Sequence, residues 1–285
     1  MELKSIAVIG AGIMGCDVAL DLASYGYNVI LKDLDTEILD KAKTKIKKGF
    51  KLVKMMKKEL KAVSIDDILS KITFTTTYDG FGQVEMVIEN IVEEWQAKKE
   101  VYQELGEVCK IDTIFAVNTS CISITKVASL MESPGKVIGA HFMNPVPLKK
   151  IVEVIRGYHT SDETVQAMIE FLKTLNKQGV VVKDSPGFVT NRVSHLFMNE
   201  AAFLIQDGVA GPKEVDTIFT QGFGHKMGPL ATADLIGLDT VVKSLDVLYE
   251  SYQDPKFRCC PLLRKMVDAG LLGKKSGKGF FEYSI

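Results

Sequence analysis

Along the first two-thirds of the chain, apolar residues gather in short continuous runs that alternate with stretches where they recur every three or four positions. Short apolar runs predict strands covered on both faces, and the periodic stretches predict helices. Their alternation is typical of an α/β domain with a mostly parallel sheet. The predicted strands are residues 4–9, 28–33, 86–91, 113–118, 136–142, 150–156 and 180–183.

After residue 188 the strand-like runs stop. Apolar periodicity bounded by glycine and proline then predicts helices. They cover residues 188–206, 213–219, 230–251 and 261–269. The change of pattern falls at Asp-Ser-Pro-Gly, residues 184–187. The sequence therefore predicts an α/β domain over residues 1–184 and an all-α domain over residues 185–285.

A lysine-rich helix is predicted over residues 36–61. Apolar positions three or four apart predict one buried face. Those positions are Leu39, Ala42, Ile46, Phe50, Val53, Met56 and Leu60. The other positions hold ten lysines against three acids. This face is either an ordinary solvated surface or a landing site for an anion, because it raises the local positive potential.

Composition narrows the function classes. Hydrophobic residues make up 46% of the 285 residues, charged residues 25%, and the net charge is −1, which argues against a nucleic-acid-binding protein. No apolar stretch approaches the roughly 20 residues of a membrane span. Five cysteines without CxxC spacing favour a reducing compartment without disulfides or a zinc site. We expect a cytoplasmic protein that binds neither nucleic acid nor membrane.

A glycine-rich loop follows the first predicted strand and precedes an amphipathic helix. It reads Gly10-Ala11-Gly12-Ile13-Met14-Gly15. In this pattern Gly10 permits a tight turn, Gly12 lets the backbone approach a pyrophosphate, and Gly15 lets helix and strand pack closely. The helix N-terminus then receives the phosphates, beside Ile13 and Met14. The context predicts a Rossmann-like dinucleotide site.

Asp33, at the end of the next predicted strand, favours NAD over NADP because its charge would repel a 2′-phosphate. Lys32 beside it leaves some tolerance for NADP. Glu93 and Lys98 follow the strand at 86–91, where the nicotinamide half of the cofactor should run. The alternative for both residues is a solvated helix start.

His141 and Glu153 are two polar residues in apolar runs. A histidine suits acid–base chemistry at neutral pH, and a buried carboxylate is costly unless a neighbour needs its charge. If strands 136–142 and 150–156 are neighbours, Glu153 can hold the imidazole and stabilise its protonated form. The remaining histidines, His159, His195 and His225, form no metal-binding pattern, and we expect no metal.

Longer motifs resemble the L-3-hydroxyacyl-CoA dehydrogenase family, including the 3-hydroxybutyryl-CoA dehydrogenases, over nearly the whole chain. They are GAGIMG, VNTSCISIT, HFMNPVP, KIVEVIRG, DSPGFVTNR, MGPLATADLIGLD and GKKSGKGFFEY. The resemblance implies a Rossmann-like NAD-binding domain, a helical domain that forms a homodimer, and substrate in a cleft between them. It also implies reversible oxidation of a 3-hydroxyacyl thioester to the 3-oxoacyl thioester.

The resemblance assigns roles to individual residues. His141 matches the family's catalytic base and Glu153 its partner. Ser120 matches the serine that binds the substrate's 3-oxygen, and Asn191 a polar group that reaches the substrate. Asn118 and Ser120 border the cofactor, and Asn144 matches a residue beside the nicotinamide. From the residues alone, Ser120 reads as a turn hydroxyl and Asn191 as an amide in an early helical turn.

The chain departs from the family at several positions. Lys54 lies where the CoA end is held, but its segment reads Lys-Met-Met-Lys. Cys121 and Cys16 replace residues that are commonly serine or glycine. Residues 252–264 resemble a branch from polyketide gene clusters that oxidises a glyceryl group on acyl carrier protein, toward hydroxy- or methoxymalonyl extender units. A lysine-rich face suits either CoA phosphates or an acidic carrier protein, so charge alone does not decide. Within the broader 3-hydroxyacyl thioester activity, the carrier-bound glyceryl group is the leading hypothesis for the substrate.

Two other functions stay open at this stage. One is a non-catalytic NAD-binding redox sensor or structural protein on the same scaffold, which would need no His–Glu pair. The other is a dehydrogenase of the 3-hydroxyisobutyrate or 6-phosphogluconate type, which relies on a catalytic lysine. The His-Phe-Met-Asn-Pro stretch and the C-terminal tail favour the thioester dehydrogenase over both.

Overall fold

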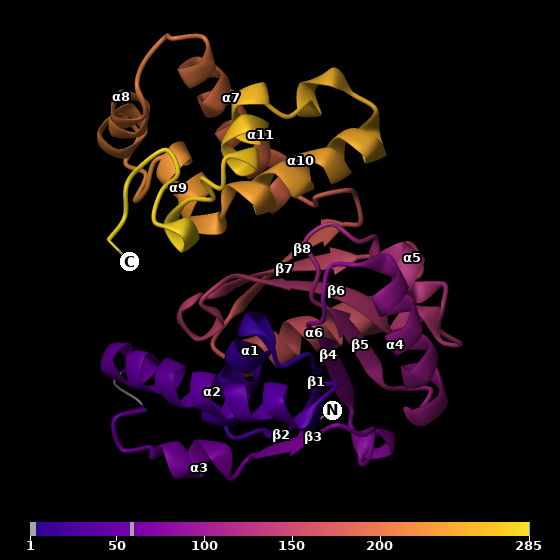
Figure 1. Cartoon of the computed structure of the whole chain (residues 1–285). Helices are drawn as coiled ribbons and strands as arrows, with labels where there is room; N and C mark the ends of the chain where they lie inside the picture. Colours follow the sequence, from indigo (N-terminus) through magenta and orange to yellow (C-terminus); the bar gives the residue numbers. More distant parts are fainter. Residues whose placement is uncertain (1–3, 58–59, 285) are drawn as a thin grey trace. The chain divides into compact units, whose positions relative to one another are not determined.

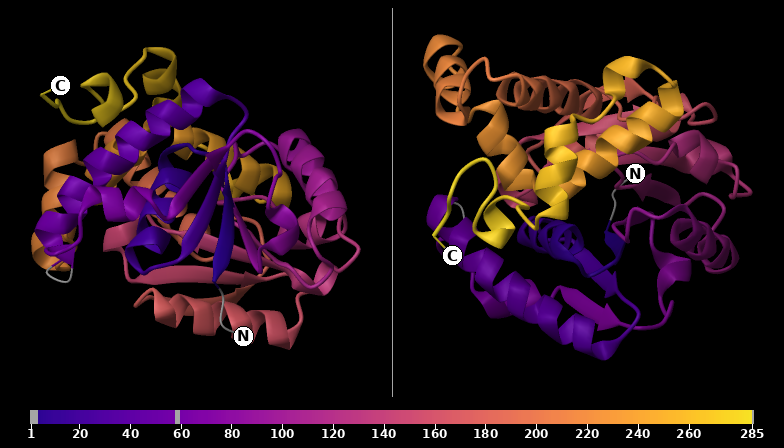
Figure 2. Two further views of the ribbon diagram at one scale, coloured as in Figure 1. Left: turned by 90° about the horizontal axis from the view of Figure 1, so that it is seen from below. Right: turned by 45° about the horizontal axis from the view of Figure 1, so that its top comes forward.

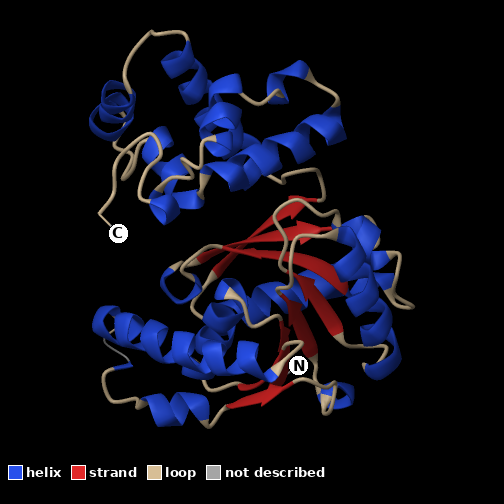
Figure 3. Cartoon of the chain, in the orientation of Figure 1, coloured by secondary structure: helices blue, strands red, loops and turns tan. Residues whose placement is uncertain are grey.

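The computed structural model describes residues 4–57 and 60–284 (Figure 1). Residue contacts divide the chain into two compact units, one that ends at Ser185 and one that begins at Pro186. The first unit contains the sheet, and the second consists of helices and loops (Figure 3). The predicted fold class, a Rossmann-like α/β domain followed by an all-α domain, is therefore confirmed.

One eight-stranded sheet organises the first unit, with strand order β3-β2-β1-β4-β5-β6-β7-β8. Neighbouring strands pair in parallel except β6 and β7, which are antiparallel. The strands are β1 (Ser5–Ile9), β2 (Asn28–Lys32), β3 (Ile72–Thr75), β4 (Met86–Glu89), β5 (Ile114–Val117), β6 (Val137–Phe142), β7 (Ile151–Arg156) and β8 (Gln178–Lys183). Each strand predicted from the sequence is present, within two residues of its predicted bounds.

β3 is the strand that the hydrophobic pattern does not predict. It lies at an edge of the sheet and pairs only with β2 among the described strands. Its sequence, Ile-Thr-Phe-Thr, alternates, and Ile72 alone is fully buried. An edge strand half covered by neighbours needs no continuous apolar run, which is why the pattern typical of buried parallel strands is missing here.

Helices cover both faces of this sheet. They are α1 (Ile13–Ser24), α2 (Thr36–Met56), α3 (Ile65–Leu69), α4 (Trp95–Val108), α5 (Ile124–Ala128) and α6 (Asp162–Thr174). α1 and α2 lie on one face and α4 on the other (Figures 1 and 2). On the α4 face, the ring of Tyr102 packs edge-on against Phe115 of β5, with centroids 6.2 Å apart.

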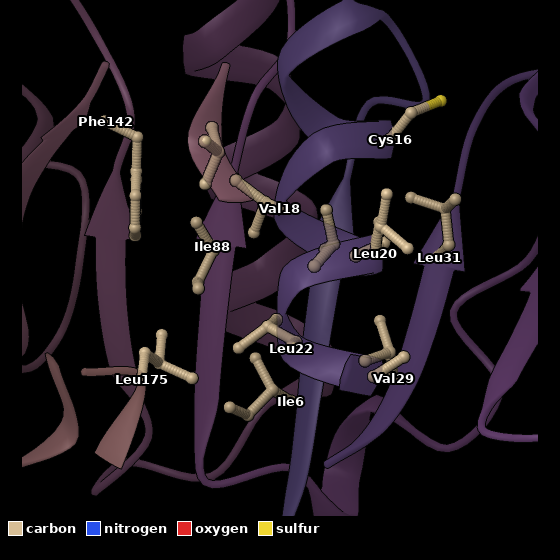
Figure 4. Close-up of a cluster of buried hydrophobic side chains, with 14 of the residues drawn as sticks. Ile6, Cys16, Val18, Leu20, Leu22, Val29, Leu31, Ile88, Phe142 and Leu175 are labelled. Atoms are coloured by element: carbon tan, nitrogen blue, oxygen red, sulfur yellow. The ribbon is translucent and has the colours of Figure 1, made fainter. Parts of the chain in front are cut away.

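The main core lies between the sheet and helices α1, α2 and α6. Ile6 and Val8 of β1 alternate with residues of the other face, and both are fully buried. Leu20 and Leu22 of α1 lie among the side chains of the neighbouring strands (Figure 4). Full burial of such a side chain contributes about 1.5–3 kcal/mol relative to leaving it exposed. This core fixes α1, and with it the glycine loop, on the carboxyl end of β1.

The lysine-rich helix is shorter than predicted. Asp35 caps its start by accepting hydrogen bonds from the N–H groups of Glu37 and Ile38, and Lys57 ends it in an extended conformation. Met56, predicted on the buried stripe, is 62% exposed, while Lys58 and Glu59 lie outside the described residues. Among the helices of the described residues, none combines the length and apolar character needed to cross a membrane.

The second unit is helical. Its helices are α7 (Thr190–Gln206), α8 (Pro212–Thr217), η5 (Ile218–Gly222), α9 (Pro229–Ile236), α10 (Leu238–Tyr252), η6 (Pro255–Phe257), α11 (Pro261–Asp268) and η7 (Lys274–Ser276). The helix predicted over 230–251 is two helices, because Gly237 adopts a φ of +102° that breaks the helical path. In the C-terminal tail, residues 270–284, isolated β-bridges join Gly273 with Lys278 and Lys278 with Glu282.

A buried carboxylate attaches the tail of the second unit to α9. Asp234, 0% exposed, accepts hydrogen bonds from the N–H groups of Phe280 and Phe281 and from the hydroxyl of Tyr283. Burial raises the pKa of Asp234, and these hydrogen bonds oppose the shift. The motifs around residues 234 and 279 thus belong to one structural contact.

Candidate active site

His141 and Glu153 face each other across β6 and β7. The antiparallel register pairs the two residues directly. Glu153 Oε2 lies 3.1 Å from His141 Nδ1, and the residues are 5% and 9% exposed, respectively. Both oddities of the sequence therefore meet at one buried contact. When Nδ1 carries the proton of the neutral imidazole, its N–H donates a hydrogen bond to the Glu153 carboxylate. Nε2 then has a lone pair that can accept a proton.

Ser120 lies on the other side of the imidazole. Its Oγ is 3.3 Å from His141 Nε2. The loop after β5 holds it there, because Glu93 Oε1 accepts hydrogen bonds from the N–H groups of Ser120 and Cys121 at 2.9 and 2.8 Å and from Thr119 Oγ1 at 2.5 Å. A hydroxyl and an imidazole nitrogen thus converge on the same space.

Lys98 is completely buried. The alternative interpretation, in which Lys98 belongs to a solvated helix start, is therefore wrong. Its Nζ lies 2.7 and 2.8 Å from the two carboxylate oxygens of Glu89, at the end of β4, and 3.8 Å from Glu93 Oε2. Burial raises the pKa of Glu89, while the ammonium of Lys98 opposes the shift. Lys98 therefore supports the acids beneath the Ser120 loop.

The glycine loop has the geometry that its spacing predicts. Gly10 has a φ of +90°, and a Cβ there would lie 2.6 Å from the carbonyl oxygen of Asn90. A Cβ on Gly15 would lie 1.7 Å from the carbonyl oxygen of Gly10. A Cβ on Gly12, at the N-cap of α1, would meet nothing within 4 Å. Gly12 therefore leaves open space at a helix N-terminus, where a pyrophosphate fits.

Two residues flank the entry to this helix. Ile13 is 64% exposed, whereas Met14 packs against the core. Asp33, just after β2, turns its carboxylate toward the loop, where Oδ2 accepts a hydrogen bond from Ala11 N at 2.5 Å. A second backbone N–H, that of Leu34, binds Oδ1 at 2.7 Å. A carboxylate has about four acceptor positions, so capacity remains for ribose hydroxyls.

Lys32 does not offer its charge to a 2′-phosphate. The residue is 6% exposed, and its ammonium lies 4.3 Å from the ring centroid of Tyr78 in a cation–π contact. The ammonium of Lys32 is therefore engaged with an aromatic ring and is not displayed on the surface.

Asn118 links the ends of three strands. Its Nδ2 donates to Asn90 Oδ1 at 2.6 Å, after β4, and its Oδ1 accepts from Phe142 N at 3.2 Å, in β6. Asn144 is exposed in the turn that follows β6. Asn118 thus joins the strand ends that carry the candidate site, and Asn144 follows two residues after the end of β6.

Lys54, predicted near the CoA end of the substrate, makes a local contact. Its Nζ donates to the carbonyl oxygen of Val63 at 2.7 Å and lies over the ring of Phe50. The side chain therefore links α2 to Val63.

Asn191 belongs to the second unit, in the first turn of α7, and is 8% exposed. Its carbonyl oxygen lies 2.9 Å from Nδ1 of His195 one turn later. The ring of His225 packs among those of Phe197, Phe219 and Phe223. Among the described residues, no three His, Cys, Asp or Glu side chains gather in a way that could hold a metal ion.

Sequence reasoning missed several polar residues around the site, namely Asp17, Asp21, Glu89, Asn90, Thr119 and Lys177. Asp21 and Lys177 are 1% and 6% exposed. One signal was present, because Asp17 and Asp21 are one turn apart in an otherwise apolar helix. For Lys177 the sequence offers no comparable signal, because it lies between Asn176 and Gln178 in a polar turn.

Two family models match nearly the whole chain. The model for the NAD-binding domain of 3-hydroxyacyl-CoA dehydrogenase matches residues 5–185. The model for the C-terminal domain of 3-hydroxyacyl-CoA dehydrogenase matches residues 187–283.

Several proteins that are similar to this chain are named as 3-hydroxybutyryl-CoA dehydrogenases. A probable 3-hydroxybutyryl-CoA dehydrogenase of Deinococcus radiodurans is 45% identical and covers 97% of this chain and 99% of its own. A 3-hydroxybutyryl-CoA dehydrogenase of Clostridioides difficile is 44% identical, covering 98% and 99%. The crystal structure of (S)-3-hydroxybutyryl-CoA dehydrogenase from Ralstonia eutropha matches with a TM-score of 0.94 at 37% identity over 100% of both chains.

Proposed function

The chain belongs to the 3-hydroxyacyl-CoA dehydrogenase family and is an NAD-dependent dehydrogenase of CH–OH groups; from this premise we propose that His141 and Glu153 are its acid–base pair. The reaction is reversible oxidation of a 3-hydroxyacyl thioester to the 3-oxoacyl thioester. The observation that carries the proposal is the buried 3.1 Å contact between His141 Nδ1 and Glu153 Oε2.

This geometry indicates where the proton of the substrate hydroxyl goes during the reaction. NAD⁺, when bound, accepts the hydride that leaves C3 of the substrate. His141 Nε2 takes the proton of the 3-hydroxyl as the C3–O bond becomes a carbonyl. Glu153 holds the Nδ1 proton, keeps the ring in the correct tautomer and stabilises the imidazolium. Ser120, whose Oγ is 3.3 Å from Nε2, donates to the 3-oxygen and holds it beside the base. A positioned acid–base group contributes about 10²–10⁴-fold in rate.

The first unit also carries the groups that we assign to the cofactor. Gly10, Gly12 and Gly15 shape the loop, and Ile13 and Met14 open the helix that receives the pyrophosphate. Asp33 accepts the ribose hydroxyls. Around the nicotinamide we assign Asn118, Asn144, Ser120 and the Glu93–Lys98 pair, with Lys98 acting through the acids that it binds.

For the thioester handle we propose CoA first, because relatives at 45% and 44% identity are named for CoA thioesters. Glyceryl-acyl carrier protein is the second candidate, on the way to hydroxy- or methoxymalonyl units. What favours it is the mixed surface of α2, where exposed lysines adjoin Leu52 and Met55, which are 50% and 83% exposed. The exposed lysines are Lys41, Lys45, Lys47, Lys48 and Lys51. Lys54 and, from the second unit, Asn191 complete the proposed substrate contacts.

The quaternary structure that we infer is a homodimer formed through the second unit. Apolar side chains on this unit are exposed, among them Val209, Ile218 and Phe223 at 68%, 57% and 68%. Such exposure is typical of a surface that pairs with another chain. We also assign the enzyme to the cytoplasm, because its five cysteines are free thiols, which suit a reducing compartment.

The decisive experiment compares the parent protein with His141→Gln. We expect NADH-linked reduction of acetoacetyl-CoA by the parent, and a fall of about 10²–10⁴-fold in kcat in the variant. NADH affinity, measured by fluorescence titration, should stay within about two-fold. Full activity in the variant would overturn the acid–base role and favour a lysine-dependent dehydrogenase.

The same assay separates the remaining alternatives. Turnover of glyceryl-loaded carrier protein without turnover of acetoacetyl-CoA would select the carrier-bound substrate. NADH binding with no turnover of either thioester would select a non-catalytic NAD sensor. A matched control is Lys173→Gln, on the exposed face of α6, whose kcat should equal that of the parent.

A further inference from the structure

Lys177 is a buried lysine whose ammonium lies close to three oxygen atoms. Its side chain is 3% exposed, just before β8. Nζ donates to the carbonyl oxygens of Val146 and Lys149 at 2.6 and 2.8 Å, and lies 2.9 Å from Asp21 Oδ2. An ammonium carries three N–H donors. Lys177 therefore joins a helix to a turn through two hydrogen bonds and one ion pair.

The turn that it binds connects the two strands of the acid–base pair. We name residues 143–150 the β6–β7 turn. His141 precedes it in β6, Glu153 follows it in β7, and the turn includes the short helix η4 (Val146–Leu148). Two of its carbonyl groups, rather than side chains, bind Lys177. The lysine thus fixes the backbone path of the turn.

The helix on the other side of the contact is α1, which begins at the glycine loop. Asp21, 1% exposed, binds Lys177, and Asp17, one turn earlier, accepts a hydrogen bond from Val146 N at 3.2 Å. Both backbone groups of Val146 are therefore held, its N–H by Asp17 and its carbonyl by Lys177. The turn is fixed to α1 from two directions.

A purely stabilising role explains these residues poorly. Apolar side chains of similar volume often replace a buried ion pair without loss of stability, because removing two charges from water is costly. Burial indeed lowers the pKa of Lys177, although Asp21 opposes the shift. What an apolar side chain cannot supply is a fixed direction for two carbonyl groups.

We propose that Lys177 is a positioning residue for the reaction: with Asp21 it fixes the β6–β7 turn to the cofactor helix and so sets the place of His141 and Asn144 relative to the bound nicotinamide. The proposal rests on the acid–base role proposed above for His141. It adds a residue that touches neither substrate nor cofactor, but holds the backbone between the two halves of the pair.

The test uses Lys177→Arg, which keeps the buried charge but presents a planar fork instead of three donors from one point. We expect a melting temperature close to that of the parent and a kcat about 10- to 100-fold lower, because a displacement of about 1 Å can cost this much. KM for acetoacetyl-CoA and the Kd for NADH should change less than about three-fold. A kcat within about two-fold of the parent would overturn the proposal.

A second variant removes the charges together. Asp21→Asn/Lys177→Met removes both charges of this pair, and the asparagine keeps a side-chain oxygen for Lys57, whose Nζ lies 3.4 Å from Asp21 Oδ1, so the variant should fold. The β6–β7 turn then loses the ammonium that donates to its two carbonyl groups. We expect the same loss of kcat. Ile68→Ala is the matched control, because it opens a cavity at the buried face of α3 and removes none of the polar groups that bind the turn. It should lower the melting temperature and leave kcat per folded molecule unchanged.

A readout independent of turnover separates this proposal from the acid–base proposal. The chain has four histidines, so selective ¹⁵N-histidine labelling gives few signals, and His141→Gln identifies the signal of His141. Lys177→Arg should move the His141 ring resonances, and Ile68→Ala should not. Unchanged His141 resonances in Lys177→Arg would overturn the positioning role of Lys177, even if the enzyme is active. If the parent protein lacks dehydrogenase activity but Lys177→Arg still moves the His141 resonances, the positioning role of Lys177 stands and the acid–base proposal is rejected.

Discussion

Glu153 stands directly opposite His141 in the antiparallel pair of β6 and β7, with Oε2 3.1 Å from Nδ1. Both strands are fully buried at these positions. The carboxylate therefore directs its charge toward the imidazole, which is held from the side away from Ser120. Because Glu153 and Ser120 contact different nitrogens of His141, substitutions can test the contribution of each side chain to catalysis separately.

Glu153→Gln should lower kcat by about 10²-fold or more, because an amide keeps the contact but stabilises the imidazolium poorly. Steady-state reduction of acetoacetyl-CoA checks this, with NADH affinity expected to be unchanged. Glu170→Gln, at an exposed ion pair with Lys173, is the control and should retain full activity. An unaltered kcat in Glu153→Gln would show that the carboxylate has no part in the proton transfer.

Gly12→Ala and Gly15→Ala should fail in different ways. At Gly12 a new Cβ meets no protein atom within 4 Å, so the melting temperature should hold while NADH binding weakens about ten-fold, or ~1.4 kcal/mol. At Gly15 the Cβ would lie 1.7 Å from the Gly10 carbonyl oxygen, so the protein itself should be destabilised. Thermal melts and fluorescence titrations measure both. Equal NADH affinity in Gly12→Ala and parent would place the pyrophosphate elsewhere.

Asp17→Asn should become more stable relative to the parent as pH rises. Burial raises the pKa of Asp17, and the hydrogen bond from Val146 opposes the shift. The folded parent therefore favours the protonated acid, and its stability contribution is lost as pH rises from about 3.9, the unfolded value, through the folded pKa. Asparagine keeps an acceptor without the charge. Denaturant melts from acid to neutral pH should show this divergence, and parallel curves would contradict it.

Tyr102→Phe should leave the free energy of unfolding unchanged or raise it by up to about 2 kcal/mol. The ring is fully buried, and among the described residues its hydroxyl has no hydrogen-bond partner. Tyr78→Phe is the comparison, because it removes a hydroxyl that donates to Glu104 at 2.6 Å, and should destabilise by about 0.5–1.5 kcal/mol. Urea denaturation measures both. A clear loss of stability in Tyr102→Phe would reveal a partner for its hydroxyl.

Gly279→Ala should destabilise the second unit by about 2–3 kcal/mol, because the new Cβ would lie 2.0 Å from Asp234 Oδ1. The tail would then lose the carboxylate that binds Phe280, Phe281 and Tyr283. Gly222→Ala, where a Cβ meets nothing within 4 Å, serves as the control. Hydrogen exchange of the tail amides should increase in the first variant alone. Equal protection in both variants would count against the Asp234 contact.

The fold was largely predictable because buried parallel strands leave continuous apolar runs. The exceptions have physical reasons. β3 lies at an edge and alternates, and Gly237 breaks a helix whose apolar period continues across it. Met56 continues the helical period but lies at the last position of α2, where the chain turns into an extended conformation and the side chain is 62% exposed.

The site was predictable where a polar residue interrupts an apolar run, as at His141 and Glu153, and where glycine spacing is constrained. Lys98 was placed beside the cofactor from its position after β4, yet it is completely buried against Glu89. Lys177 was missed because its partners are carbonyl groups of a distant turn. Bonds to the backbone leave no mark in residue identity, so a sequence cannot reveal them.

The reversal of direction at β7 has a consequence for how the molecule assembles. β6 and β7 are joined by a short turn, so His141 and Glu153 meet after a small loop closes, at a low entropic cost. Ser120 and the nucleotide loop reach the same place only when distant segments dock. The contact between His141 and Glu153 should accordingly form early during folding and separate late during unfolding, within a hairpin that the other segments join later.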